Sequence, residues 1–95
     1  MTLAEQLRFM FTTLHSGSVN LALHVASIPF IVWGLMQRRV SLIALGASLE
    51  VLGHAYNYLV RFNPEQRRKA TRVLPVQAGL SFVVFTLLLK LFRWF

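Results

Sequence analysis

Apolar residues dominate the chain and form one short periodic segment followed by three long runs. The short segment begins at Thr2 and Glu5, which have the T-x-x-E spacing of a capping box. Apolar residues then recur at helical intervals on one face: Leu3, Leu7, Met10, Phe11 and Leu14. The pattern predicts an amphipathic helix over residues 3–15. Because a helix of this length is too short to cross a bilayer, we expect it at the membrane interface or packed on the other helices.

The three long apolar runs cover residues 19–36, 40–60 and 75–92. At 1.5 Å per residue the first run extends about 27 Å, close to the thickness of a bilayer core. A polar turn at residues 37–39 separates the first two runs, and Asn63, Pro64 and Glu65 have the pattern of a helix start. We place the basic residues that follow in a connection over residues 61–72. Each run is a candidate transmembrane helix.

Composition supports a membrane protein. Of the 95 residues, 56% are hydrophobic and 14% charged, and the mean hydropathy is +0.58, whereas soluble domains carry about 25% charged residues. A soluble monomer cannot cover so much apolar surface, and without cysteine this chain has no disulfides. We predict an all-α integral membrane protein in one domain, residues 1–95, with three transmembrane helices and an N-terminal amphipathic helix. A four-helix bundle is the alternative if the first helix inserts among the others, and a homodimer would bury further surface.

The net charge of +7 favours anionic partners. The basic residues border the apolar runs without the interleaved aromatic residues of a stacking platform, so we expect membrane lipid and no nucleic acid as partner. Three spans place the N-terminus and the 61–72 connection on one side, here called side A. Side A carries six Lys/Arg residues against four on the other side, which favours side A in the cytoplasm.

Polar residues inside the runs fall at one depth. When the first two runs pair as an antiparallel hairpin, Asn20 comes level with Asn57, and His24 with His54. Glu50 lies one turn deeper, and helical spacing puts these residues on one stripe per helix. Polar residues of other elements are expected at the same place near side A: His15, Gln77 and Ser81.

Three imidazoles and a carboxylate at one place suit a metal ion. Ionisable groups in hydrocarbon cost roughly 2.5–3.5 kcal/mol each, so they are expected in the bundle interior and mark a functional site. Nitrogen ligands and an acid without sulfur suit Fe(II), Zn(II) or Mn(II), and composition does not choose among these. The alternative is that the Asn, Gln, Ser and His side chains only hydrogen-bond the helices to one another.

The segment from His15 to Pro29 resembles a known signature. It has the spacing H-x4-N-x3-H-x4-P, with Asn20 and His24 at the inner positions, and so resembles the Mpo-type 2-hydroxy fatty acid dioxygenase-like membrane proteins. Residues 50–54, Glu-Val-Leu-Gly-His, are similar to that family's Q-x-x-G-H segment, with Pro64 as the proline that follows it. The resemblance covers about residues 7–66.

This resemblance implies a small helical membrane protein in which histidines hold Fe(II). The activity it implies is the oxidative shortening of a 2-hydroxy fatty acid by one carbon, in fatty acid α-oxidation. By position, His15, His24 and His54 would be the metal ligands, and Asn20 a supporting residue.

The chain departs from the family at two positions in the second run. It has Glu50 where the family usually has Gln, and Tyr58 where the family usually has Glu. Glu50 keeps one carboxylate on the same helix face, so it is a candidate catalytic residue, as is Tyr58 as a hydrogen-bond donor to dioxygen. Arg61 is a candidate for binding the substrate head group, and Asn57 and Gln77 are candidate supporting residues.

Two hypotheses follow. The first is a membrane-embedded, His-ligated Fe(II) dioxygenase that acts on a 2-hydroxy fatty acid or a related lipid-derived acid, with dioxygen as co-substrate. The second is a non-enzymatic small membrane protein whose polar residues hold helices or a partner subunit together. Metal content distinguishes the two.

Overall fold

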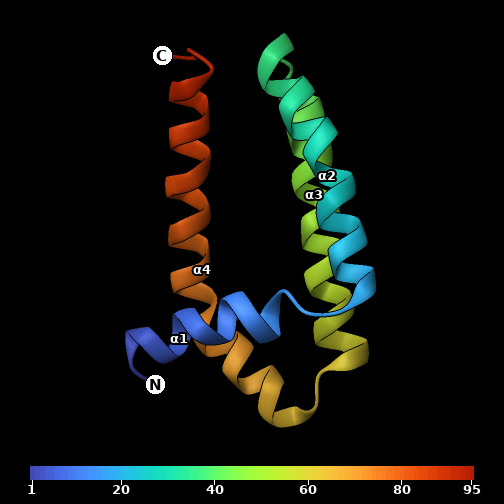
Figure 1. Ribbon diagram of the computed structural model, residues 1–95, viewed down its shortest axis with the longest axis vertical. Coiled ribbons are helices and arrows are strands. Elements are labelled where there is room, and N and C mark those ends of the chain that lie inside the picture. The colour runs from blue at the N-terminus through green and yellow to red at the C-terminus, as the bar shows by residue number, and fades with distance from the viewer.

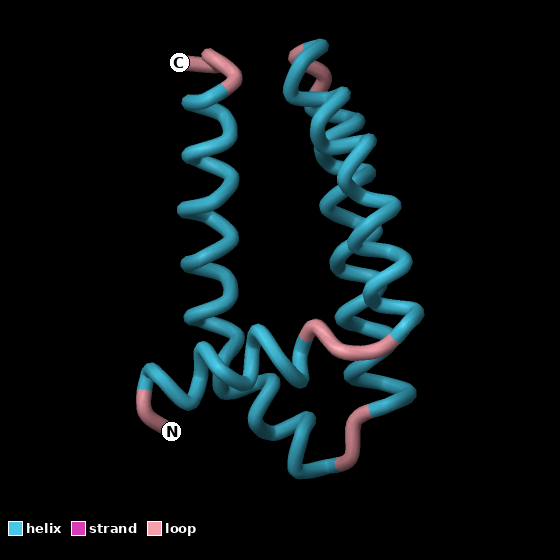
Figure 2. Tube along the Cα trace, viewed as in Figure 1, coloured by secondary structure: helices cyan, strands magenta, loops and turns pink.

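The computed structural model describes all 95 residues and is helical throughout, without strands. Helix α1 (Leu3–Phe9) continues into a π-helical turn, η1 (Met10–Leu14), and a short loop leads to α2 (Ser18–Gln37). Helix α3 (Val40–Tyr56) likewise continues into a π-helical turn, η2 (Asn57–Arg61), and is followed by α4 (Pro64–Leu91). Figure 2 shows that only short loops separate the helices. The predicted all-α class is confirmed.

Side chains cap the two helices whose starts the sequence predicts. Thr2 Oγ1 accepts a hydrogen bond from the backbone N–H of Glu5 at 3.2 Å. At the start of α4, Asn63 and Gln66 form a capping box in which each side chain accepts a hydrogen bond from the backbone N–H of the other. These bonds satisfy donors that have no partner within the helix.

The predicted connection over residues 61–72 is wrong, because α4 begins at Pro64 and is helical through that stretch. The predicted third span, 75–92, is therefore the second part of a longer helix. Pro64 suits a first turn, whereas Pro75 lacks an N–H group and crowds the turn before it. Figure 1 shows α4 changing direction between its slanted first turns, coloured gold to orange, and its long straight part. The start of the apolar run at Pro75 thus marks a bend and not a helix start.

Helices α2 and α3 form an antiparallel hairpin and lie side by side (Figure 1). Arg38 closes the turn in the left-handed region, with φ 55°, and its N–H donates to the carbonyl of Gly34. Glycines allow close contact between the helices, because a Cβ on Gly46 would overlap Ile31 of α2 and one on Gly53 would overlap the side chain of Asn20. The predicted pairing around residues 37–39 is confirmed.

Helix α1 and η1 lie across the base of the molecule, against the first turns of α4 (Figure 1). The hydrophobic core is formed here by six buried residues: Phe9, Met10, Leu14, Phe62, Ala70 and Val73. Because α1 lies across the base and not among the other helices, the four-helix bundle considered from the sequence is not formed.

Helix α4 stands apart from the hairpin over much of its length (Figure 1). It rejoins the hairpin at the end opposite α1. There the indole N–H of Trp94 donates to the carbonyl of Leu35 at 2.9 Å, and Nη2 of Arg38 donates to the carbonyl of Arg93 at 2.7 Å. We call these four residues the C-terminal clasp.

Most apolar side chains face the surroundings of the molecule, since only 14 of the 95 residues are buried. Two helices, Ser18–Gln37 and Pro64–Leu91, are long and apolar enough to cross a membrane. Helix α3 has 17 residues before it passes into η2. Two of the predicted spans therefore have the required length and composition as single helices, and the third stays a prediction.

Candidate metal centre

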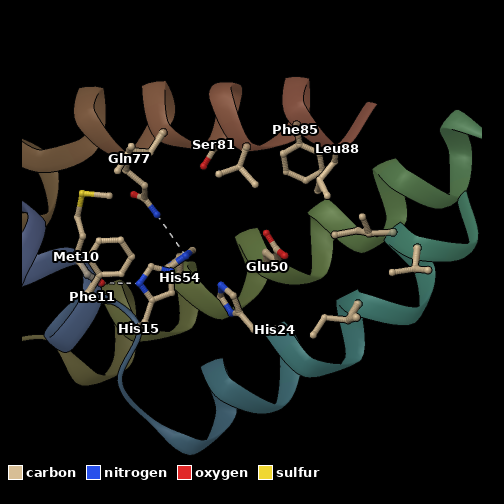
Figure 3. A pocket seen from close by; sticks show the side chains of 15 residues that line it. Met10, Phe11, His15, His24, Glu50, His54, Gln77, Ser81, Phe85 and Leu88 are labelled. Carbon is tan, nitrogen blue, oxygen red and sulfur yellow. Dashed lines mark hydrogen bonds between the residues drawn. The ribbon is translucent and has the colours of Figure 1, made fainter. Parts of the chain in front are cut away.

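Three histidines from three different segments of the chain meet in one place (Figure 3). His15 follows η1, His24 lies early in α2, and His54 lies near the end of α3. Their ring centroids are 4.8 to 5.3 Å apart, and the rings meet edge to face. One ring nitrogen from each residue lies within 4.8 Å of the other two. The predicted convergence of the three histidines is confirmed.

Backbone carbonyls fix the orientation of two of these rings. His24 Nδ1 lies 2.9 Å from the carbonyl oxygen of Asn20, and His15 Nδ1 contacts the carbonyl oxygen of Met10. A ring nitrogen that faces a carbonyl carries the proton, so Nε2 keeps a free lone pair. Metal-binding histidines have this arrangement, because the donated N–H fixes the tautomer and directs the other nitrogen at the ion.

Two buried amides hold the loop that carries His15. Asn20 and Asn57 are fully buried, and their amide groups donate to the carbonyl of Leu14 at 3.0 and 3.3 Å. Asn57 also donates to the carbonyl of Ser16 at 2.8 Å. Since the two carbonyls flank His15, both helices of the hairpin position this residue through its backbone.

Arg61 belongs to the same network. Its Nη1 donates to Oδ1 of Asn57 at 3.0 Å and to Oγ of Ser16 at 3.2 Å. The guanidinium also packs on Gly17, whose φ of 95° favours glycine. Arg61 does not line the cavity that contains the histidines. The structure therefore does not place Arg61 where the predicted contact with a substrate head group requires it.

His54 is the least constrained of the three rings. The side-chain amide of Gln77 contacts its Nε2 at 3.3 Å, and its Nδ1 is buried without a hydrogen-bond partner. A buried polar atom left unpaired costs about 1–3 kcal/mol. Through Gln77, helix α4 reaches the histidine cluster, as the sequence predicts.

The three residues fit a metal ion after a small adjustment. Nitrogens bound at about 2.1 Å to one tetrahedral ion lie about 3.4 Å apart, so the present spread of up to 4.8 Å must contract by about 1.4 Å. The free Nδ1 and the long contact at Nε2 leave the His54 ring able to rotate in this way. Three neutral imidazoles suit Fe(II), Zn(II) or Mn(II) and leave coordination positions open for other ligands.

The histidines form the polar end of a cavity of about 460 Å³. Three further polar side chains line this cavity with them: Glu50, Gln77 and Ser81. The rest is lined by apolar side chains, with Met10 and Phe11 next to His15 and the others on α2 and α4: Ile28, Ile31, Val32, Leu80, Val84, Phe85 and Leu88. Figure 3 shows the histidine rings and Gln77 at one end, and Phe85 and Leu88 at the other. The volume is typical of a small-molecule site, about 300–1,000 Å³.

Glu50 lines this cavity but is not part of the histidine cluster. Its Oε1 accepts a hydrogen bond from the hydroxyl of Ser27 at 3.0 Å, and Ser27 is fully buried. The carboxylate is thus held against α2, one turn of α3 away from His54.

Tyr58 does not line the histidine cavity. The guanidinium of Arg67 is 5.9 Å from the centroid of its ring, and Nε of Arg67 donates to its carbonyl oxygen at 2.8 Å. Tyr58 borders a second hollow between α3 and α4, which His54 and Gln77 also line. The structure therefore does not bring this predicted catalytic residue to the histidine cavity.

The two π-helical turns were not predicted, and both lie beside the cluster. η1 ends directly before His15, and η2 begins three residues after His54. In η2 the N–H of Phe62 donates five residues back, to Asn57, at 2.8 Å. Turns of this kind are rare and occur often at functional sites. A single π-helical turn is too short to give a repeating pattern of apolar residues that differs from that of an α-helical turn. The sequence therefore did not indicate η1 or η2.

Comparison of the chain with protein-family models, with curated proteins and with solved structures finds no match. The resemblance of residues 15–29 and 50–54 to the dioxygenase family stays a prediction from residue spacing. The case for a function therefore depends on the histidine cluster and its cavity.

Proposed function

We propose that this chain is an integral membrane protein that binds one Fe(II) ion through His15, His24 and His54 and oxidises a lipid-derived acid. The substrate class is a 2-hydroxy fatty acid or a close relative, with dioxygen as co-substrate. The observation that carries the proposal is the position of the three histidines near one end of a cavity whose lining is mostly apolar.

The donor set favours a catalytic ion over a purely structural one. Three imidazoles leave positions open, whereas structural sites are usually closed by four protein ligands. When bound, Fe(II) supplies the redox chemistry with dioxygen that protein side chains lack. The spacing of His15, Asn20 and His24, which resembles that of the dioxygenase family, supports iron over zinc.

The lining of the cavity suits an amphipathic substrate. Gln77 and Ser81 offer an amide and a hydroxyl beside the histidines, where they would hydrogen-bond the carboxylate and hydroxyl groups of a 2-hydroxy acid. The apolar walls from α2 and α4 would take the acyl chain and exclude water from it. Glu50, next to Ser27, is the acid available for proton transfer at this end.

We also propose that the chain crosses the membrane three times, with the histidine cluster near side A. Helix α1 would lie at that interface, next to the basic residues at the start of α4. The larger number of Lys/Arg residues on side A favours the cytoplasm for it.

Metal analysis of the purified protein tests this function. The full chain, prepared in detergent without a His tag and loaded anaerobically with Fe(II), is expected to hold stoichiometric iron by elemental mass spectrometry. The triple His15/His24/His54 alanine variant should hold almost none. Tyr58→Phe is the matched control and should keep its iron, because Tyr58 lies outside the cavity.

The outcomes separate the candidate functions. Iron that is lost in the triple variant, together with oxygen-dependent consumption of 2-hydroxy fatty acids, supports the dioxygenase. Zinc in place of iron would overturn the redox chemistry and keep the metal site.

A second candidate function is that of a non-enzymatic membrane protein that holds helices or a partner subunit together. One observation favours it: the amides of Asn20 and Asn57 both bind the backbone of the His15 loop and so tie the hairpin to this loop. Equal absence of metal from the wild type and the triple variant, even after Fe(II) loading, would favour this function.

A further inference from the structure

The apolar part of the cavity has a defined far end. The last residues that line it are Val32 on α2 and Leu88 on α4. The next turn of α2 contains Leu35, which is 1% exposed and accepts the hydrogen bond from Trp94. The C-terminal clasp therefore lies directly beyond the cavity, at the end opposite the histidines.

An unusual backbone conformation builds the clasp. Arg93 has φ 61°, in the left-handed region that residues with a Cβ rarely adopt. This turn ends α4 and directs the chain back, so that Trp94 N donates to the carbonyl of Leu89 while the indole reaches α2. Arg38, which is also left-handed, donates to the carbonyl of Arg93 from the hairpin side. Such outliers persist only where surrounding contacts hold them.

The cavity is open along its side. Ile28 and Val84 line it and are still more than half exposed, so an acyl chain can enter laterally between α2 and α4. In a membrane, that opening faces lipid. An acyl chain that extends from the histidines along α4 would meet the C-terminal clasp beyond the last turn of α4.

We propose that the C-terminal clasp, through the Trp94 ring, is the stop that limits the length of the acyl chain bound in the cavity. This inference rests on the proposed function, because it takes the ligand to be an acyl chain with its head group at the histidines. From Gln77 to Leu88 the cavity follows α4 for about 16 Å at 1.5 Å per residue. With C–C bonds of about 1.5 Å an extended chain advances about 1.3 Å per methylene, so the cavity takes about twelve methylenes.

Native mass spectrometry of the full chain in detergent, titrated with saturated fatty acids from hexanoic to stearic acid, tests the stop. The affinity of the wild type should rise about fourfold per added methylene and then level off when the acyl chain reaches the C-terminal clasp. In Trp94→Ala the rise should continue to longer acids while the shortest acids bind as before. A purely structural role for Trp94 would weaken all lengths alike, and that result would overturn the stop.

A matched pair keeps the test decisive if Trp94→Ala is poorly folded. Leu88→Trp fills the far end of the cavity and should make occupancy level off at shorter acids. Leu87→Trp places the same ring on the outer surface, where Leu87 is 63% exposed, and should leave the length profile unchanged. Equal profiles for both variants would overturn the inference.

The test also separates this inference from the proposed function. A length profile that shifts as expected in a protein that binds no metal supports the stop and overturns the iron chemistry. A wild type that holds iron but binds none of the acids overturns both the substrate class and the stop.

Discussion

The two ends of the cavity differ in what their hydrogen bonds hold. At the histidine end, amides from α2 and α3 bind the carbonyls of Leu14 and Ser16, so the loop with His15 is fixed by two helices. At the far end, Trp94 and Arg38 join α4 to the hairpin through one carbonyl each. Between the ends, α4 stands apart and apolar side chains line the cavity.

The difference between the two ends indicates where side chains must be positioned accurately. If the histidines bind the proposed metal ion, their nitrogens must lie within a few tenths of an ångström of a common centre, and buried amides that fix the His15 loop provide this accuracy. An acyl chain needs only apolar walls, which are tolerant of position because the hydrophobic effect has no direction. The following substitutions test this contrast, from the largest expected effect to the smallest.

Removing a histidine should have the largest effect. His24→Ala and His54→Ala should each lower metal affinity by more than the about 10–100-fold typical of lost supporting residues, since each removes a ligand. The variants should still insert into membranes, because neither residue contributes to the core at the base. Elemental mass spectrometry and membrane fractionation measure the two effects. Full metal retention by both variants would eliminate the proposed ligand set.

Loosening the His15 loop should have the next largest effect. Asn57→Ala removes the donors to Leu14 and Ser16, and we expect metal affinity to fall about 10–100-fold. Asn63→Ala is the matched control, because it removes a helix cap far from the histidines and should cost about 1 kcal/mol of stability with metal affinity unchanged. Competition with a chelator measures the affinities. Equal affinity in Asn57→Ala and wild type would show that the loop is positioned without this amide.

The hairpin contact gives a smaller effect on stability. Gly53→Ala places a methyl group on the side chain of buried Asn20, and we expect a loss of about 1–3 kcal/mol in the free energy of unfolding. Gly79→Ala makes the same change where nothing lies within 4 Å, so it should be neutral or stabilising by up to about 1 kcal/mol. Unfolding in mixed micelles with increasing denaturing detergent measures both. A loss of the same size in both variants would contradict close packing of α3 on Asn20 of α2.

Glu50→Gln should have the smallest effect on the metal. The amide oxygen of Gln can accept the hydrogen bond from Ser27 in the same place, and Glu50 lies outside the histidine cluster. We expect iron content to stay near that of the wild type, with Glu65→Gln, an exposed acid on α4, as the control for lost charge. Complete loss of iron in Glu50→Gln alone would show that the carboxylate is a ligand.

The level positions of His24 and His54 were predictable because both lie on one hairpin, where helical rise and the turn at residues 37–39 determine the pairing. His15 was predictable for a different reason, because the loop after residue 14 is short and keeps it near the start of α2. The direction of a side chain at a helix end depends on irregular backbone turns, which leave no repeating pattern in the sequence. Tyr58 and Arg61, which lie in η2, therefore point to other partners than predicted.

The positions of Pro64 and Pro75 led to the wrong prediction of a connection over residues 61–72, which belong largely to α4. The sequence marks a helix start at Asn63–Pro64 and a new apolar run at Pro75, and the two signals suggest a connection between them. The structure joins them in one bent helix, because Ala70 and Val73 pack into the core under α1 and keep the first turns helical. Packing energy of this kind comes from residues far away in the sequence and outweighs the local cost of a proline.

By itself the sequence determined the all-α class, the hairpin of α2 and α3 and the meeting of His15, His24 and His54, because the helical period and chain connectivity act over short distances. Only the tertiary structure decided which atoms hold those histidines, where α1 lies and how α4 encloses a cavity. Backbone carbonyls are present at every residue, so no residue type reveals that Leu14, Leu35 and Arg93 offer theirs to distant side chains. These hydrogen bonds and helix positions depend on contacts between segments that lie far apart in the sequence.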